Sequence, residues 1–273
     1  MPRNITSITG FVKRIFELER ENSSTLFFRG HSNKKKYKLE PSLYRNDGHK
    51  ESEHLIFREL LIANPSDFFD DQSTFEKLVR MQHYSMPTRL LDITANPLMA
   101  LYFACKASTD ETGEVVILEI KKEHIKFFDS DTVSCISNLA RLPESDKTSL
   151  NYSLPHHTFN QTPSIKKLIH LIKEEKPYFL DQIIPSDLQR IICVKGRMTN
   201  TRITSQSGAF LLFGHNATLP EEGTPDIKIT RVGINKSDKE KMLTELDQLN
   251  INESTVFPYI ENSAKYIAQK YKV

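Results

Sequence analysis

Three polar clusters, far apart along the chain, each lie beside a β-prone run and hold the residue types best suited to chemistry. In the first, Arg29, Gly30 and His31 follow the run Thr25–Phe28. Arg29 is a planar cation able to bind a phosphate or a carboxylate through two hydrogen bonds, and Gly30 would let a ligand reach the main chain. An arginine paired with a structural carboxylate is the commoner arrangement in proteins, so both interpretations stay open.

The second cluster occupies residues 82–89 and precedes an apolar run that ends in Asp92 and Thr94. Because buried polar groups have to satisfy one another, we expect His83, Arg89 and Asp92 to form a hydrogen-bonded network. Such a network would either shape a pocket or hold the fold. His83 has the residue type of a general base, although a lone histidine more often has a structural role.

The third cluster covers residues 202–210. Gln206 offers a donor and an acceptor to a ribose or a base edge, and Gly208 again permits close approach. A bulged hairpin with an exposed glutamine is the alternative. Four lysines within residues 34–38 add positive charge just after Arg29, which would attract phosphates or form an ordinary solvated loop.

Composition narrows the functional classes. The chain of 273 residues has a net charge of +2, which is too near neutral for indiscriminate adsorption to nucleic acid or membrane. P-loop, Rossmann, zincin and esterase signatures do not occur in the sequence. His156 and His157 lack acidic or cysteine partners at metal spacing, so no metal is expected. Three cysteines without a C-x-x-C pair, and no apolar run of about 18 residues, predict a reducing, cytoplasmic location without a membrane segment.

The clearest structural pattern is a strand, a helix and a strand in succession. Thr88–Thr94 is typical of a buried strand. Asn96 is a suitable N-cap and Pro97 suits the first turn of a helix that continues to about Ser108. Glu114–Ile120 is then expected to form a central strand of a sheet.

Further elements are expected on both sides of this unit. Helices are predicted at about 8–21, 51–61, 75–82, 164–175, 237–249 and 258–271, and strands at about 25–28, 190–194 and 204–213. The polar segment 130–162 is expected to form long ordered loops. The predicted fold class is α+β, a small mixed central sheet flanked by helices. We expect a single domain over residues 1–273, with a motif-bearing core at about 25–215 and a helical C-terminal cap at about 216–273.

Several motifs follow one another in a defined order along the chain. They are Phe28-Arg29-Gly30, Gln82-His83-Tyr84, Pro87 through Asp92, Asn96-Pro97-Leu98 continuing to Ala104, Arg202-Ile203, and Gln206 with Gly208 and Phe210. Their co-occurrence over about residues 25–215 resembles the FRG-domain family. Ser85 stands where glycine is usual in that family, and Ile93 stands where tryptophan is usual. The family is named for a sequence motif, and its name implies no activity.

The layout is also similar to that of ADP-ribosyltransferases, which implies a fold of that type and NAD as the substrate. Under this resemblance the catalytic residues are Arg29, Gln206 and His83. Arg29 would clamp NAD, and Gln206 would hold the ribose or an acceptor. The residues expected to bind NAD are Arg29, Gly30, His31, Arg89, Asp92 and Thr94. Many such transferases use a late glutamate, and this chain has Gln206 instead.

The resulting hypothesis is an NAD-using ADP-ribosyltransferase that modifies a protein or a nucleic acid. The resemblance implies a toxin of bacterial or phage defence, with an antitoxin as partner. One alternative is a nucleic-acid-binding protein or ribonuclease that uses the lysines of 34–38 with Arg29, His31 and His83. Its binding should weaken steeply with salt. The other alternative is a non-catalytic binding module in which the three clusters are scaffolding.

Overall fold

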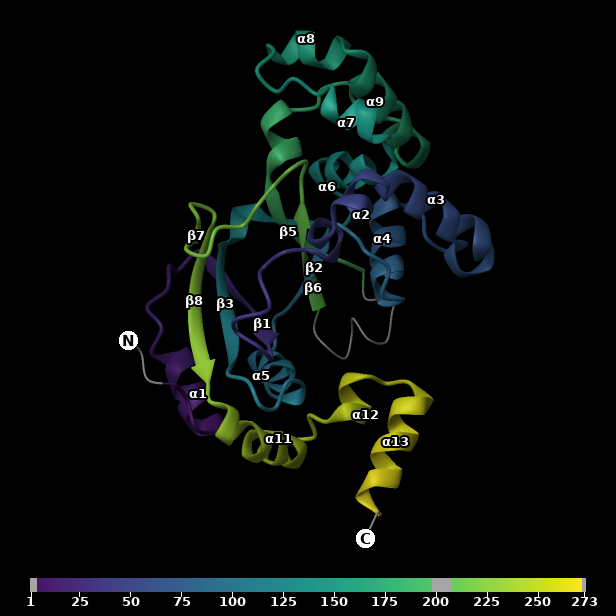
Figure 1. Cartoon of the computed structure of the whole chain (residues 1–273). Helices are drawn as coiled ribbons and strands as arrows, with labels where there is room; N and C mark the ends of the chain where they lie inside the picture. The colour runs from purple at the N-terminus through teal and green to yellow at the C-terminus, as the bar shows by residue number, and fades with distance from the viewer. Residues whose placement is uncertain (1–3, 198–207, 272–273) are drawn as a thin grey trace.

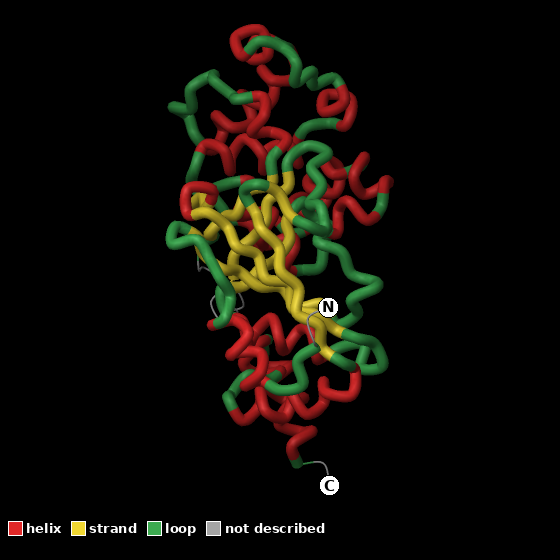
Figure 2. Tube along the Cα trace, turned by 90° about the vertical axis from the view of Figure 1, so that its left-hand side faces the viewer, coloured by secondary structure: helices red, strands yellow, loops and turns green. Residues whose placement is uncertain are grey.

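A curled, eight-stranded sheet forms the centre of the computed structural model, which describes residues 4–197 and 208–271 (Figures 1 and 2). The strand order is β4-β5-β6-β2-β1-β3-β8-β7, and β4 with β5 is the parallel pair. The strands are β1 Ser24–His31, β2 Leu90–Thr94, β3 Gly113–Lys121, β4 Ile125–Phe127, β5 Ile191–Lys195, β6 Gly208–Phe213, β7 Gly223–Thr224 and β8 Ile227–Ile234. The mixed α and β character is therefore confirmed, whereas the expectation of a small sheet is wrong.

Helices cover the sheet in two groups at its opposite ends (Figure 1). One group consists of α2 Asp47–Glu51, α3 Glu53–Ala63, α4 Thr74–His83, α6 Asp131–Ser137, α7 Glu144–Thr148, α8 His156–Gln161 and α9 Pro163–Glu175. The other consists of α1 Ile8–Phe16, α5 Pro97–Lys106, α11 Lys239–Gln248, α12 Glu253–Val256 and α13 Ile260–Lys270. None of the described helices is long and apolar enough to cross a membrane.

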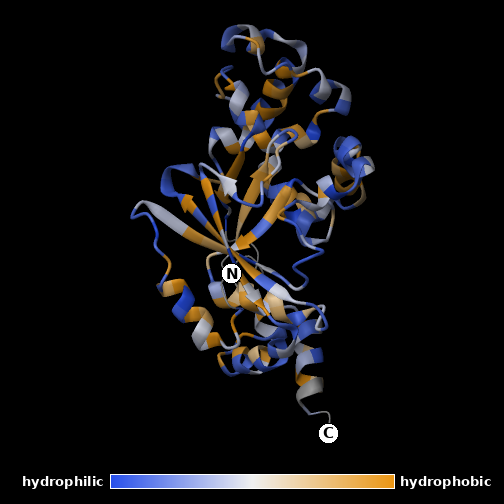
Figure 3. Cartoon of the chain, turned by 60° about the vertical axis from the view of Figure 1, so that its left-hand side comes forward, coloured by the Kyte–Doolittle hydropathy of each residue, from blue (hydrophilic) through white to orange (hydrophobic). Residues whose placement is uncertain are grey.

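The hydrophobic core is centred on the sheet, where Figure 3 shows most of the hydrophobic colour. It follows from the alternation of side chains along the strands. Neighbouring residues of a strand point to opposite faces. Phe28 of β1 therefore packs with Leu101 of α5 and Met242 of α11, while Phe27 joins a separate cluster with Val116 and Leu211 of other strands. Both faces of β1 are thus buried at this point, which fixes the strand that carries Arg29.

The predicted strand, helix and strand around Asn96 are confirmed. The Asn96 side chain accepts hydrogen bonds from the amides of Leu98 and Met99, at 3.0 and 3.4 Å, and Pro97 is the first residue of α5. Both features favour helix initiation at this residue. The helix then returns across the sheet and packs against β1.

The segment 130–162, expected to form loops, contains the helices α6, α7 and α8 instead. They have 7, 5 and 6 residues, so none of them is long enough to display a clear helical period. Ser130 caps α6 by accepting a hydrogen bond from the amide of Val133. Val133 and Ile136 are fully buried, so tertiary packing stabilises a helix that its own sequence only weakly predicts.

The C-terminal part is only partly helical, which corrects the expected cap. The strand β8 lies inside residues 216–273 and pairs with β3 from Gly113↔Ile234 to Ile120↔Ile227. Its polar residues alternate with apolar ones because one face of this part of the sheet is less covered. The expected helices α11 and α13 follow β8.

Candidate functional site

A cavity opens where β1 and β2 separate. Among the described residues the register between these two strands consists of the pair Phe28↔Thr94, whereas β1 pairs with β3 along its whole length. Beyond Thr94 the chain turns into α5, and on the other side of the pair the two strands diverge. The resulting cavity has a volume of about 310 Å³ and is lined from both strands. This is the size of a small ligand site.

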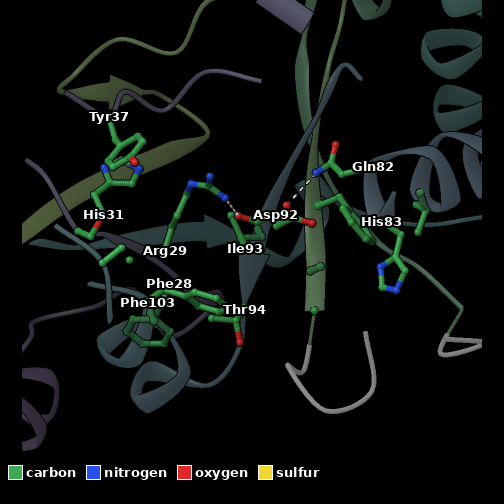
Figure 4. Close-up of a pocket in the computed structure, with 18 residues that line it drawn as sticks. Phe28, Arg29, His31, Tyr37, Gln82, His83, Asp92, Ile93, Thr94 and Phe103 are labelled. Atoms are coloured by element: carbon green, nitrogen blue, oxygen red, sulfur yellow. Dashed lines mark hydrogen bonds between the residues drawn. The ribbon is translucent and has the colours of Figure 1, made fainter. Parts of the chain in front are cut away.

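The walls of the cavity combine aromatic surfaces with a few polar groups (Figure 4). Phe28 and Tyr37 line it from the N-terminal part of the chain, Phe103 from α5 and Phe210 from β6. The polar lining residues are Arg29, His31, Ser32, Gln82, His83, Asp92 and Thr94. Pockets of this mixed character bind planar ligands on the aromatic surface and orient them by the polar groups.

Arg29 reaches across the gap between the strands. Its Nη1 donates a hydrogen bond to the main-chain carbonyl of Asp92, and its Nε has no hydrogen-bond partner among the described residues. Burial lowers the pKa of Arg29, the Asp92 carboxylate raises it, and the nearby Arg45 lowers it further. The expected alternative, a structural ion pair, does not occur for Arg29 within the described part of the chain. Its charge is therefore available to an anionic ligand.

Among the described residues that line the cavity, Asp92 is the one with a carboxylate. It is the exposed residue of β2, between buried neighbours on both sides. Gln82, at the end of α4, donates a hydrogen bond from Nε2 to Asp92 Oδ2 at 2.8 Å. The side-chain oxygen of Gln82, Oε1, accepts a hydrogen bond from the hydroxyl of Thr88, which holds the amide in this orientation. The sequence placed Gln82 in a polar cluster but gave it no role.

His31 is buried at the C-terminal end of β1. Its Nδ1 lies 3.2 Å from Oε1 of Glu114, the residue directly opposite on β3. Burial lowers the pKa of His31, and the neighbouring Arg29 and Arg231 lower it as well, against the opposing effect of Glu114. The imidazole is thus neutral at neutral pH. Nothing in the sequence singled out Glu114, because its partner lies 83 positions away.

His83 and Thr94, both from the second polar cluster, line the cavity. His83 lies at the end of α4, where its Nε2 is hydrogen-bonded to the hydroxyl of Tyr259 and the two rings are 5.9 Å apart. The hydroxyl of Thr94 accepts a hydrogen bond from the amide of Asn96 at 3.0 Å. Thr94 therefore supports the start of α5 from within the cavity wall.

Arg89 is not a cavity residue, which corrects its predicted place among the NAD-binding residues. It is fully buried, and its guanidinium bonds both carboxylate oxygens of Glu53 and the carbonyl of Phe213. Lys147 donates a hydrogen bond to the same carboxylate at 3.0 Å. The predicted network of His83, Arg89 and Asp92 is therefore wrong, because the guanidinium of Arg89 bonds Glu53 and Phe213 instead.

Gly30 lines the cavity, but the need for glycine there comes from α5. A Cβ at Gly30 would lie 2.0 Å from the carbonyl oxygen of Ala100 and 2.6 Å from the amide of Ala104. The close approach predicted for a ligand is thus already made by a helix. Gln206 lies outside the described residues, whereas Gly208 of the same cluster lines the cavity.

The lysines of 34–38 are exposed in the loop that carries Tyr37. The ammonium group of Lys36 lies 5.8 Å from the centre of the Tyr37 ring, and Tyr37 lines the cavity. Positive charge thus lies beside the cavity rather than inside it. Within residues 4–197 and 208–271, no group of three or more histidine, cysteine or acidic side chains is arranged to hold a metal ion.

Comparison with known proteins identifies one family. The family model of the FRG domain matches residues 24–113, which begin with β1 and end at the first residue of β3. No curated protein and no solved structure matches the chain. The matched range contains Arg29, His31, Gln82 and Asp92 of the cavity, and the Gln206 cluster falls outside it. The chain therefore carries an FRG domain, and the cavity between β1 and β2 is built largely from that domain.

Proposed function

We propose that the cavity between β1 and β2 binds NAD and that the protein transfers ADP-ribose from NAD to an acceptor. The observation that carries this proposal is that one cavity is lined both by the Asp92 carboxylate and by Arg29, which bonds the main-chain carbonyl of Asp92 and has no ion-pair partner among the described residues. Arg29 would bind a phosphate of NAD through its free N–H groups. Phe28 and Phe103 offer aromatic surface to the nicotinamide ring.

The proposed reaction breaks the bond between nicotinamide and C1′ of the ribose. The electron pair of that bond leaves with nicotinamide, so positive charge develops on the ribose as it does in glycoside cleavage. A fixed carboxylate next to this charge stabilises the transition state. Asp92 takes that role, and the hydrogen bond from Gln82 keeps its carboxylate directed into the cavity.

The volume of about 310 Å³ suits the nicotinamide ribose half of NAD. The adenosine half then extends towards the opening of the cavity. The acceptor in this proposal is a group on a protein or a nucleic acid. We further propose that the activity serves as a toxin, which an antitoxin partner would inhibit by covering the cavity, because modification of cellular acceptors would arrest growth.

Calorimetry with NAD, followed by measurement of nicotinamide release in the presence of cell extract, tests the proposal. Asp92→Asn should keep NAD binding and lower nicotinamide release by about 100-fold, because the variant lacks the negative charge that stabilises the transition state. Arg29→Lys should weaken NAD binding by at least about 10-fold, because a point charge replaces a two-pronged donor. Asp110→Asn and Arg14→Lys, both exposed and neither among the residues that line the cavity, are the matched controls.

Wild-type protein that neither binds NAD nor releases nicotinamide would overturn the proposal. A second candidate, RNA binding or cleavage, is favoured by the exposed lysines of 34–38 beside Tyr37. RNA binding that weakens steeply with salt and is lost in a triple alanine variant of Lys34, Lys35 and Lys36 would support that candidate instead.

A further inference from the structure

A buried chain of charged and ionisable groups runs from the cavity to the surface across three adjacent strands. His31 of β1 is paired directly with Glu114 of β3, so their side chains share one face of the sheet. Glu114 in turn is opposite Gly233 of β8, which has no side chain, and Arg231 lies two residues before that glycine. The register therefore places His31, Glu114 and Arg231 side by side.

Distances confirm that the three groups are in contact. His31 Nδ1 and Arg231 Nη1 lie 3.2 and 2.6 Å from the same oxygen, Oε1 of Glu114. The side chains of His31 and Glu114 are only 2% and 1% exposed. On its other side, the buried Nη2 of Arg231 forms an ion pair at 2.5 Å with Glu221, whose side chain is exposed. The buried carboxylate is thus compensated by a cation and does not depend on a proton from His31.

This arrangement fixes which nitrogen of His31 carries the proton. A carboxylate accepts hydrogen bonds, so the contact with Glu114 requires Nδ1–H on the imidazole. In the neutral ring, Nε2 then keeps its lone pair. Nε2 has no hydrogen-bond partner in the described part of the chain, although it is shielded from solvent, and the His31 side chain lines the cavity.

An unpaired buried nitrogen argues against a purely structural histidine. Leaving a buried acceptor unsatisfied destabilises the folded protein, because the group loses its hydrogen bonds to water and gains none. A histidine retained for stability alone would gain from a partner on both nitrogens. Groups held at such a cost beside a cavity are commonly those that engage a ligand.

We infer that His31 is the general base of the transfer reaction and that Glu114 is its positioning residue. This inference rests on the proposed function for the identity of the donor, NAD. The acceptor is a hydroxyl, either of a macromolecule or of water. Its oxygen forms a bond to C1′ of the ribose as the bond from C1′ to nicotinamide breaks. The hydroxyl proton moves to Nε2 of His31 and leaves through the cavity after the product has left.

Glu114 supports this step in two ways. It holds the imidazole in the tautomer whose Nε2 is free, and it stabilises the imidazolium that forms when the proton is taken. Arg231 keeps Glu114 in place from the far side, at 2.6 Å. Tyr37 lies beside the ring, with 6.0 Å between the ring centres, and limits its rotation.

The tautomer can be measured without any ligand. Nitrogen-15 NMR of histidine-labelled protein distinguishes a protonated ring nitrogen from one with a lone pair, and the signals missing in His31→Gln assign the residue. We expect a protonated Nδ1 and an unprotonated Nε2 in the wild type. Glu114→Gln should abolish this preference, whereas Glu123→Gln, at the exposed carboxylate beside His124, should leave the His31 signals unchanged. A protonated Nε2 in the neutral wild-type ring would overturn the inference.

Turnover then tests the catalytic role. His31→Gln should lower nicotinamide release in the presence of cell extract by about 100-fold or more, while NAD affinity measured by calorimetry changes only a few-fold. The control His170→Gln alters a histidine that is 80% exposed beside Glu174 and should behave as wild type. If wild type and His31→Gln release nicotinamide equally fast, the role of His31 fails and the proposed function stands. If the wild type releases no nicotinamide, the proposed function fails. The role of His31 as general base then fails too, whichever ring nitrogen carries the proton.

Discussion

Arg29 of β1 donates a hydrogen bond to the main-chain carbonyl of Asp92 in β2, across the gap where the two strands separate. In a continuous antiparallel ladder, a carbonyl at this place would accept from a main-chain amide of the neighbouring strand. The arginine side chain therefore replaces a lost ladder hydrogen bond. Arg29 thus lines the cavity and also satisfies the Asp92 carbonyl that the separation of the strands exposes. The opening between the strands is therefore stabilised by the fold itself.

Replacement of Gly30 by alanine should disrupt the packing of α5 on β1. The added Cβ would lie 2.0 Å from the carbonyl oxygen of Ala100, which belongs to the helix backbone and cannot rotate away. We expect Gly30→Ala to lower the free energy of unfolding by at least about 2 kcal/mol, measured by urea denaturation. Because Phe103 lies on the same helix and lines the cavity, ligand affinity should fall as well.

Gly10→Ala is the matched control for this variant. A Cβ at Gly10 would have the Ser7 hydroxyl as its nearest neighbour, at 3.3 Å, and Gly10 is an exposed residue of α1. Alanine is favoured over glycine inside a helix by up to about 1 kcal/mol, so this variant should be no less stable than the wild type. Equal stability of Gly30→Ala and wild type would show that α5 does not pack on β1 as described.

The sequence predicted the strands and helices whose signals are local. Asn96 and Pro97 mark the start of α5, and the run Glu114–Ile120 is apolar enough to identify β3. The short helices α6 to α8 have no such signal. Their stability depends on distant contacts, as when Asn160 of α8 bonds both the amide and the carbonyl of Ile183, at 2.8 and 3.0 Å. No pattern in the sequence links these two residues.

The site shows the same division between local and distant signals. Arg29, His31 and Asp92 were predicted from residue type and from their place at strand ends, and all three line the cavity. Arg89 has the same residue type and a similar place. Its buried partner Glu53 lies 36 positions away, so the sequence could not show that this arginine is structural.

Replacement of Arg89 should unfold the protein rather than change ligand binding specifically. In Arg89→Met, Glu53 keeps Lys147 as its remaining charged partner among the described residues, in a fully buried setting. Removing one member of such a cluster leaves an imperfectly compensated charge, and we expect a loss of about 3 kcal/mol or more in the free energy of unfolding. Arg14→Met, at an exposed position of α1, should change stability by less than about 0.5 kcal/mol.

One result would contradict a purely structural role for Arg89. If Arg89→Met melted as the wild type does and yet failed to bind NAD, Arg89 would have to contact the ligand. That result would restore the role predicted for it from the sequence and contradict the separation of Arg89 from the cavity.

Acid should destabilise the protein through His215, which is buried near Arg89 and is not among the residues that line the cavity. Burial lowers the pKa of His215 to about 4, and the positive charges of Arg89, Lys147 and Lys50 act in the same direction against the opposing Glu144. The Nδ1 of His215 is also 2.8 Å from the hydroxyl of Tyr152.

The sign of the pH effect follows from these two pKa values. In the unfolded chain His215 takes up a proton as the pH falls through its ordinary pKa of 6.5, whereas in the folded protein it stays neutral down to about pH 4. Protons therefore favour the unfolded state throughout this window, and stability falls as the pH is lowered. Urea denaturation at several pH values should show this effect. Between pH 6.5 and 4 the free energy of unfolding of the wild type should fall by on the order of 2 kcal/mol more than that of His215→Gln, after allowance for solvent screening. Parallel stability curves for the two proteins between pH 6.5 and 4 would mean that His215 is protonated in the folded state and that its buried contact with Tyr152 does not persist.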